Sequence, residues 1–584
     1  MLVRVGRSRP ASLIPLIALV IGPATPLASR TPPQMRAVAP DGPVRCNRGE
    51  QDGRGPAIGR MTQKTPVYSS LPAPPPPPMI SPMTTQDIVV SAQRASPAMQ
   101  NMPSVIATAT SAPLEDRERY AGKDVAGIFA VAQQPVSTFS VDVDTGSYAN
   151  VRRFLVQGQI PPVAAVRTEE MLNYFRYDYP APEDRSRPFS VSTDMAITPW
   201  NADTRLLRIG IKGFDLKREQ RPPANLVFLV DVSGSMYDQD KLPLVKSALS
   251  LLADRLSPRD KVSIVVYAGA AGIVLEPTSN PAYVKAALDC LEAGGSTAGG
   301  QGMELAYATA RAHFIKGGVN RVIMATDGDF NVGISSDEGI EAIVKKNRES
   351  GITLTTLGFG QGNYNEAMME HVADVGNGNY AYIDSAIEAQ KVLDEEMAAT
   401  LFTIAKDVKI QIEFNPSLIK EYRLIGYENR ALAEEDFDND TVDAGDIGSG
   451  HQVTALYELV PVNAKGWLPV RHFDANRAPV ASPLAGSDLA WLKLRYKLPD
   501  GERSMLIERP VTASLASSAQ PPQGDMAFAS AVAAFGQKLR GDKYLGSFSY
   551  ADIRRLAGPQ QGYLREEFPK LASLADKGGA APTD

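Results

Sequence analysis

Histidine and cysteine are scarce in this sequence of 584 residues, which contains 4 histidines and 2 cysteines. The histidines, at positions 313, 371, 451 and 472, do not have the spacing of metal ligands, which disfavours a zinc enzyme. Cys46 lies in a polar stretch, whereas Cys290 lies within a helical pattern and is expected to be a small core residue. Because the two contexts differ so much, a structural disulfide is not expected, and stability should come from packing.

Long apolar runs and an excess of positive charge are also lacking. The one run to consider for a membrane, residues 13–21, is broken by Pro15 and is much shorter than the roughly 20 residues of a spanning helix. Sixty Lys and Arg against 66 Asp and Glu give a net charge of −6, without the basic field typical of nucleic-acid binding. We therefore expect neither a nucleic-acid partner nor a transmembrane segment in the mature chain.

The first 118 residues have the composition of a targeting and linker segment. Three arginines precede the apolar run and small residues follow it up to Ala28, so residues 1–28 are predicted to be a signal peptide that directs export to the periplasm or cell envelope. Twenty of the 45 prolines lie in the first 118 residues, and residues 29–118 are predicted to be a disordered linker. Within it, residues 87–94 resemble the energy-coupling box of TonB-dependent outer-membrane receptors, although nothing downstream resembles their barrel.

From about Ala130 onward the pattern becomes globular. Residues 119–224 contain short helical and strand patterns, and residues 225–407 alternate buried strands with amphipathic helices, which predicts a doubly wound, Rossmann-like parallel α/β domain. Residues 408–577 first show strand patterns and then helices, so a β-rich domain with C-terminal helices is expected there. Residues 578–584 are predicted to be a disordered tail.

Oxygen-bearing side chains follow two strands of the predicted α/β domain. Asp231, Ser233 and Ser235 come directly after the strand 226–230, and Asp327 follows the strand 322–325. A glycine-rich loop, residues 294–300, contains Thr297. Because open α/β sheets place ligands at the carboxyl ends of their strands, these side chains are expected to meet. An oxygen-only donor set selects Mg²⁺, with Mn²⁺ or Ca²⁺ as substitutes.

These segments resemble the metal-ion-dependent adhesion site of von Willebrand factor type A (VWA) domains. The resemblance implies that Ser233 and Ser235 are direct metal ligands, that Thr297 is direct in the ligand-competent state, and that Asp231 and Asp327 act through water. Flanking stretches at 136–148, 169–175 and 443–446 are similar to the YfbK-like family of bacterial envelope proteins. That similarity implies a family-type N-terminal region before the VWA domain, at 119–224, and a family-type C-terminal region after it.

An acidic loop carries the other cluster of possible cation ligands. Asp436, Asp438 and Asp440, with Asp443 and Asp446 nearby, are interpreted as a solvated turn rather than as a second Ca²⁺ site, because Ile447 stands where a bidentate Glu would be needed.

The function predicted from these features is protein binding rather than catalysis. A cation held by neutral hydroxyls stays electrophilic and can bind a carboxylate of a partner protein, so an adhesion or scaffold role in the cell envelope is expected. Two alternatives remain: a Mg²⁺-dependent hydrolase of the envelope, and a structural scaffold with an incidental metal. The strands before and after the VWA domain are further expected to form one β-sandwich into which that domain is inserted.

Overall fold

The computed structural model describes residues 118–141, 143–182, 187–296, 299–328, 337–469 and 488–578. The predicted signal peptide, the linker up to residue 117, the segment 87–94, Thr297 and residues 579–584 lie outside this part of the chain. Among the described residues, the structure has no helix with the length and apolar character needed to cross a membrane.

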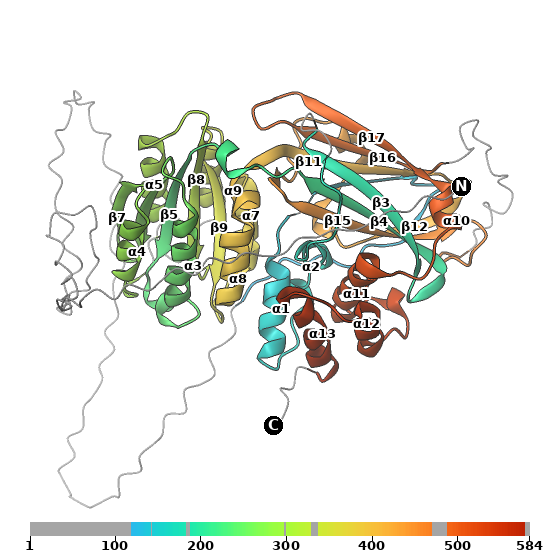
Figure 1. Cartoon of the computed structure of the whole chain (residues 1–584). Coiled ribbons are helices and arrows are strands. Elements are labelled where there is room, and N and C mark those ends of the chain that lie inside the picture. Colours follow the sequence, from blue (N-terminus) through green and yellow to red (C-terminus); the bar gives the residue numbers. More distant parts are fainter. Residues whose placement is uncertain are drawn as a thin grey trace, which may run out of the picture. The chain divides into compact units, whose positions relative to one another are not determined.

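The α/β domain is built on a six-stranded sheet with the strand order β10-β9-β8-β5-β6-β7 (Figure 1). All eight residues of the central strand β5 are buried, as expected for a strand covered on both faces. The strands are β5 (Ala224–Asp231), β6 (Lys261–Tyr267), β7 (Ala271–Thr278), β8 (Val319–Thr326), β9 (Thr353–Phe359) and β10 (Tyr380–Ile383).

Helices cover both faces of this sheet, which confirms the doubly wound architecture. One core cluster contains residues of α3, α4 and α8, and a second, on the other side of the sheet, contains residues of α5, α6 and α7. The helices are α3 (Leu242–Arg255), α4 (Pro281–Asp289), α5 (Gly299–Ala312), α6 (Asp337–Arg348), α7 (Glu366–Val375), α8 (Ala386–Gln390) and α9 (Met397–Leu401), with a π-helical turn at Lys391–Glu395.

The sheet departs from the predicted parallel arrangement at one edge strand, β7. β7 runs antiparallel to β6, whereas the other pairs are parallel. The physical reason is the connection, since only residues 268–270 separate β6 from β7. A parallel return would need a crossover of a dozen or more residues, so such a short link permits only a hairpin.

The chain before and after the α/β domain forms a two-sheet β-structure. One sheet has the order β1-β12-β15-β4-β3 and the other has the order β13-β2-β11-β16-β17, with β14 paired to β11. The strands are β1 (Phe129–Ala130), β2 (Val136–Ser140), β3 (Phe189–Thr198), β4 (Asn201–Gly213), β11 (Thr403–Phe414), β12 (Ile419–Ile425), β13 (Ala431–Leu432), β14 (Ile447–Gly448), β15 (Gln452–Pro461), β16 (Asp488–Lys497) and β17 (Ser504–Thr512).

The two sheets share one core, as the insertion hypothesis requires. Ile209 of β4 and Val453 of β15 belong to the same buried cluster as Phe139 of β2 and Ile410 of β11. β15, which follows the α/β domain in sequence, pairs directly with β4, which precedes it. β11 belongs to the second sheet, so the returning chain contributes to both layers of the sandwich.

Helices from the two ends of the described chain pack together. Phe175, directly after α2, contacts Phe528 of α11 and Phe568 of α13 edge to face, and these residues share one buried cluster. The helices are α1 (Gly146–Val156), α2 (Thr168–Asn173), α10 (Ala513–Ser517), α11 (Gly524–Leu539), α12 (Tyr550–Ala557) and α13 (Tyr563–Asp576). The sequence patterns had not indicated α13, because Pro569 interrupts it.

The expectations for Cys290 were wrong on two points. Cys290 is half-buried at the C-terminal end of α4 rather than a core residue, and it is disulfide-bonded. Because a thiol at a partly exposed helix end can meet a segment distant in sequence, the local context did not decide whether it pairs. The other cysteine, Cys46, lies outside the described residues.

Candidate metal centre

The turn after β5 places the predicted hydroxyl ligands beside each other. Asp231 is the last residue of β5, and its carboxylate accepts the backbone N–H of Ser233 at 2.9 Å and the hydroxyl of Thr326, at the end of β8, at 2.9 Å. These two bonds tie the turn to the neighbouring strand. They leave the hydroxyl oxygens of Ser233 and Ser235 3.0 Å apart. Asp231 therefore holds the turn in shape rather than facing outward itself.

Two carboxylates lie buried behind the hydroxyl pair. Asp231 and Asp327 are both fully buried. Burial, and next the nearby charge of Asp327, raise the pKa of Asp231 to about 6, against the opposing hydrogen bonds from Ser233 and Thr326. Two buried negative charges at the same edge of the sheet create a negative electrostatic potential. This potential favours a cation at the hydroxyl oxygens.

The described part of the glycine-rich loop reaches the same turn. The backbone N–H of Gly294 donates to the carbonyl of Val232 at 2.8 Å, and the N–H of Gly234 donates to the carbonyl of Gly295 at 3.0 Å. Gly295 has a φ of +88°, a conformation that favours glycine. The predicted ligand Thr297 follows in this loop but lies outside the described residues, so its role stays a prediction.

Asp327 has a partner that the sequence interpretation missed. The ammonium of Lys241, the residue before α3, donates to Asp327 Oδ2 at 3.0 Å and to Asn363 Oδ1 at 3.0 Å. The amide of Asn363 also donates to Asp327 Oδ2 at 3.0 Å. Lys241 is 4% exposed. In the sequence, Lys241 stands at the start of a helical pattern and carries no signal that its side chain turns inward.

The donor set fits a small hard cation. Four of the five predicted residues, Asp231, Ser233, Ser235 and Asp327, converge at the carboxyl edge of the sheet and present only oxygen. The described residues contain no group of three or more His, Cys, Asp or Glu side chains suited to a metal ion. A site here would therefore depend on hydroxyl ligands, with Ser233 and Ser235 holding the cation and the carboxylates supporting it.

The turn that carries the hydroxyls reaches the protein surface. Gly234 is exposed and Ser235 is half-buried, whereas Ser233 is buried. Tyr237, at the end of the short helical turn Gly234–Tyr237, is 78% exposed. This exposed aromatic side chain therefore stands two residues after Ser235, on the same short turn.

The loop that carries Asn363 is also held from its far side. The N–H of Gly362 donates to the Glu118 carboxylate at 2.8 Å, and the N–H of Arg119 donates to the carbonyl of Tyr364 at 2.9 Å. The segment before β1 is therefore hydrogen-bonded to the loop that contacts Asp327. Hydrogen bonds thus connect the N-terminal region to the edge of the α/β domain that carries the candidate metal site.

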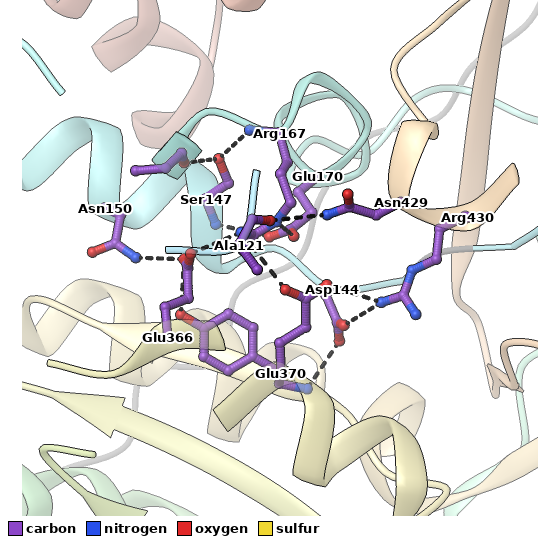
Figure 2. Close-up of polar contacts among 12 residues, drawn as sticks. Ala121, Asp144, Ser147, Asn150, Arg167, Glu170, Glu366, Glu370, Asn429 and Arg430 are labelled. Atoms are coloured by element: carbon purple, nitrogen blue, oxygen red, sulfur yellow. Dashed lines mark hydrogen bonds and ion pairs between the residues drawn. The ribbon is translucent and has the colours of Figure 1, made fainter. Parts of the chain in front are cut away.

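A buried charge cluster follows directly along the chain, where α7 begins. Figure 2 shows Arg167 between Glu170 of α2 and Glu366 of α7. Arg167 Nη1 lies 2.7 Å from Glu366 and 3.7 Å from Glu370, and Asn150 of α1 donates to Glu366 at 2.9 Å. Burial raises the pKa of Glu366, while Arg167 opposes the shift. The cluster fixes α7 to α1 and α2.

The aspartates of the acidic loop contact other protein groups, and two of them share Arg495. Asp436 caps the short helical turn Glu434–Phe437 by accepting the N–H of Ala433, and Asp438 and Asp440 pair with Arg495 at 2.9 and 3.0 Å. Asp443 pairs with Arg348, and Asp446 accepts the N–H of Asp407 at 3.3 Å.

Asp446 should make stability depend on pH. Burial, followed by the charges of Asp407 and Asp443, raises its pKa to about 7, from about 3.9 in an unfolded chain. The stability that this group contributes is thus fully present below about pH 4 and is lost as the pH rises through about 7. Asp446→Asn should therefore gain on the order of 1–2 kcal/mol relative to wild type between about pH 5 and pH 8, measured by urea unfolding. Asp438→Asn, at an exposed position of the same loop, is the matched control; an equal pH response of Asp446→Asn and wild type would contradict the assignment.

Family models match these three parts of the chain. The model for the von Willebrand factor type A domain matches residues 225–396, so the α/β domain with its hydroxyl-bearing turn is a VWA domain. A model described as "von Willebrand factor" matches residues 114–208, and one described as "Uncharacterized protein YfbK, C-terminal" matches residues 399–577. The protein YfbK of Escherichia coli (strain K12) is 50% identical over 475 residues, which cover 78% of this chain and 81% of YfbK. The chain therefore belongs to the YfbK family.

Two other similar proteins match about a third of this chain. The Synechocystis protein sll0103 is 33% identical over 187 residues, 32% of this chain and 43% of that protein. The crystal structure of BatB from Bacteroides thetaiotaomicron, 26% identical, covers 30% of this chain and 97% of that chain with a TM-score of 0.26. VWA domains often mediate protein–protein interactions and commonly bind a divalent metal at the adhesion site.

Proposed function

We propose that this chain is an exported protein of the periplasm or cell envelope whose VWA domain holds one divalent cation and binds an acidic residue of a partner protein. The observation that carries the proposal is the pair of hydroxyl oxygens of Ser233 and Ser235, 3.0 Å apart on a turn where Ser233 is buried and Ser235 is half-buried. Both carboxylates behind them already accept hydrogen bonds from protein groups. The direct ligands are thus neutral, and the cation would keep most of its charge for an external carboxylate.

Mg²⁺ is the cation that this geometry favours. Two adjacent ligands of octahedral Mg²⁺, each about 2.1 Å from the ion, lie about 3 Å apart, whereas the longer bonds to Ca²⁺ need a wider spacing. The 3.0 Å between the two hydroxyl oxygens is compatible with this spacing. The same separation is a hydrogen-bond distance, so the two hydroxyls can bond to each other when no cation is bound. Mn²⁺ is the expected substitute.

A location outside the cytosol is supported by two features. The signal-like segment of residues 1–28 predicts export. In addition, Cys290 is disulfide-bonded, and disulfides persist mainly in oxidising compartments such as the periplasm.

We assign no catalytic step to this chain. At the described part of the site, Asp231 accepts hydrogen bonds from Ser233 and Thr326, and Asp327 accepts them from Lys241 and Asn363. Neither carboxylate is placed as a general base for water, which a metal-dependent hydrolase would need. Turnover of a generic phosphoester that requires both Mg²⁺ and Asp231 would contradict this assignment.

Ser233→Ala should lower Mg²⁺ affinity by at least about 10–100-fold, the range for losing even an outer-shell partner of a metal. It should also abolish Mg²⁺-dependent capture of proteins from envelope extracts by the full chain. Both effects are measured against Ser247→Ala, which removes an exposed hydroxyl from α3. Identical capture in EDTA and in Mg²⁺ would contradict a cation-dependent interaction and would leave the metal an incidental part of a scaffold.

A further inference from the structure

The position of Lys241 gives the cation site a feature that a set of oxygen ligands does not explain. Lys241 is buried at the carboxyl edge of the sheet, and its ammonium lies 3.0 Å from Asp327, one of the two buried carboxylates. We propose that Lys241 is an internal counter-cation that holds Asp327 in place when the site is free of metal and lowers the affinity of the site for divalent ions. The inference rests on the proposed cation site and adds a residue that sets its affinity.

The protein is shaped to admit this side chain. Gly360 has a φ of +73°, and a Cβ at this position would lie 2.3 Å from Cε and 2.4 Å from Cγ of Lys241. Any side chain at residue 360 would therefore displace the lysine. Asn363, in the same loop, contributes its amide oxygen to the ammonium and its amide nitrogen to Asp327. Asp327 and Asn363 thus bind the ammonium, and Gly360 leaves space for the side chain that carries it.

Backbone hydrogen bonds also fix the position of Lys241. The N–H of Lys241 donates to the carbonyl of Asp238 at 3.0 Å, and its own carbonyl accepts the N–H of Val245 in the first turn of α3. The residue is therefore fixed at the helix start, with little freedom to move its charge away.

The charge balance predicts the effect on a bound ion. With Asp231 and Asp327 ionised, the buried carboxylates carry two negative charges, and the Lys241 ammonium offsets one of them. A divalent ion at Ser233 and Ser235 is attracted by both carboxylates but repelled by Lys241, in a buried setting where screening is weak. Removal of the ammonium should therefore tighten cation binding. It should also destabilise the metal-free protein, because Asp327 loses a charged partner.

The test compares Lys241→Met and Lys241→Gln with wild type in the full chain, with Mn²⁺ alone as the probe. Both variants should bind Mn²⁺ about tenfold more tightly in calorimetry. Both should melt at a lower temperature than wild type in EDTA, and Mn²⁺ should raise their melting temperature by more than it raises that of wild type. Lys246→Met is the matched control, since it removes a charge from the same helix at a position where the lysine donates to the carbonyl of Asp289.

The outcomes separate this inference from the proposed function. If wild type binds one Mn²⁺ and both Lys241 variants bind it equally or more weakly, the counter-cation assignment is wrong and the proposed function stands. If wild type binds no Mn²⁺, the cation site itself is wrong, and the inference fails with it. Lys241→Gln keeps a hydrogen-bond donor for Asp327, so it gives a result even if Lys241→Met does not fold.

Discussion

Replacing Arg167 with methionine is expected to lower the free energy of unfolding by about 3–5 kcal/mol, the cost typical of breaking a buried ion pair from one side. Arg167 is 3% exposed and contacts Glu170, Glu366 and Glu370. Its loss takes this cation from the buried carboxylates of Glu170 and Glu366, whereas Glu370 keeps Arg430. α7 begins at Glu366, next to the loop whose Asn363 contacts Asp327. The change should therefore also make the surroundings of Asp327 more mobile. Urea unfolding with a tryptophan or circular-dichroism signal measures the effect.

The control for this prediction is Arg176→Met, because Arg176 is half-exposed and lies 3.7 Å from Glu396. That variant should lose less than about 1 kcal/mol, as is typical of exposed pairs. In a double-mutant cycle, Glu366→Gln should cost less in the Arg167→Met background than in wild type, since it removes one of the uncompensated charges. A loss below about 1 kcal/mol for Arg167→Met would show that the cluster does not hold α7 to α1 and α2.

Arg423→Met should be equally costly, at about 3–5 kcal/mol, for the same reason. Arg423 of β12 is 1% exposed and binds Glu458 of β15 at 2.8 Å, Asp542 at 2.7 Å and Gln537 of α11 at 2.6 Å. It also lies over the ring of Tyr544, 4.6 Å from the ring centre. These contacts join the sandwich to the C-terminal helices, so limited proteolysis should cut the variant between residues 512 and 550 faster than wild type.

The matched control is Arg555→Met on α12, where the arginine side chain is 76% exposed and pairs only with Asp552 in the described structure. It should unfold and be cleaved like wild type. If Arg423→Met matched this control in both measurements, the C-terminal helices would be held by apolar packing alone, and the Arg423 contacts would contribute little.

The parts of the fold that could be predicted were those encoded locally. Each buried strand of the VWA domain is a short apolar run, and Asp231, Ser233 and Ser235 follow one of them within five residues. A strand that ends in this way places its ligands at the sheet edge whatever the rest of the chain does. The hydroxyl pair was therefore predictable, as was the sandwich formed by strands on either side of the insertion.

The parts that could not be predicted depend on contacts between distant segments. Arg167 and Glu366 are 199 positions apart, and each looks like an ordinary surface charge on a helix. Lys241 turns inward only because Gly360 leaves room for it and Asn363 receives it, more than 100 positions later. The disulfide of Cys290 and the helix α13, interrupted by Pro569, have the same origin, since tertiary contacts there outweigh local pattern.

The central claim is that the cation held by Ser233 and Ser235 keeps a coordination position open to an external carboxylate. Water proton relaxation of Mn²⁺ bound to the full chain measures this directly, because it reports exchangeable water on the ion. The account predicts one bound Mn²⁺ per chain that carries exchangeable water, and a fall in relaxation enhancement when a glutamate-containing peptide is added but not when its glutamine counterpart is added. Bound Mn²⁺ without exchangeable water, or no response to the glutamate peptide, would contradict it.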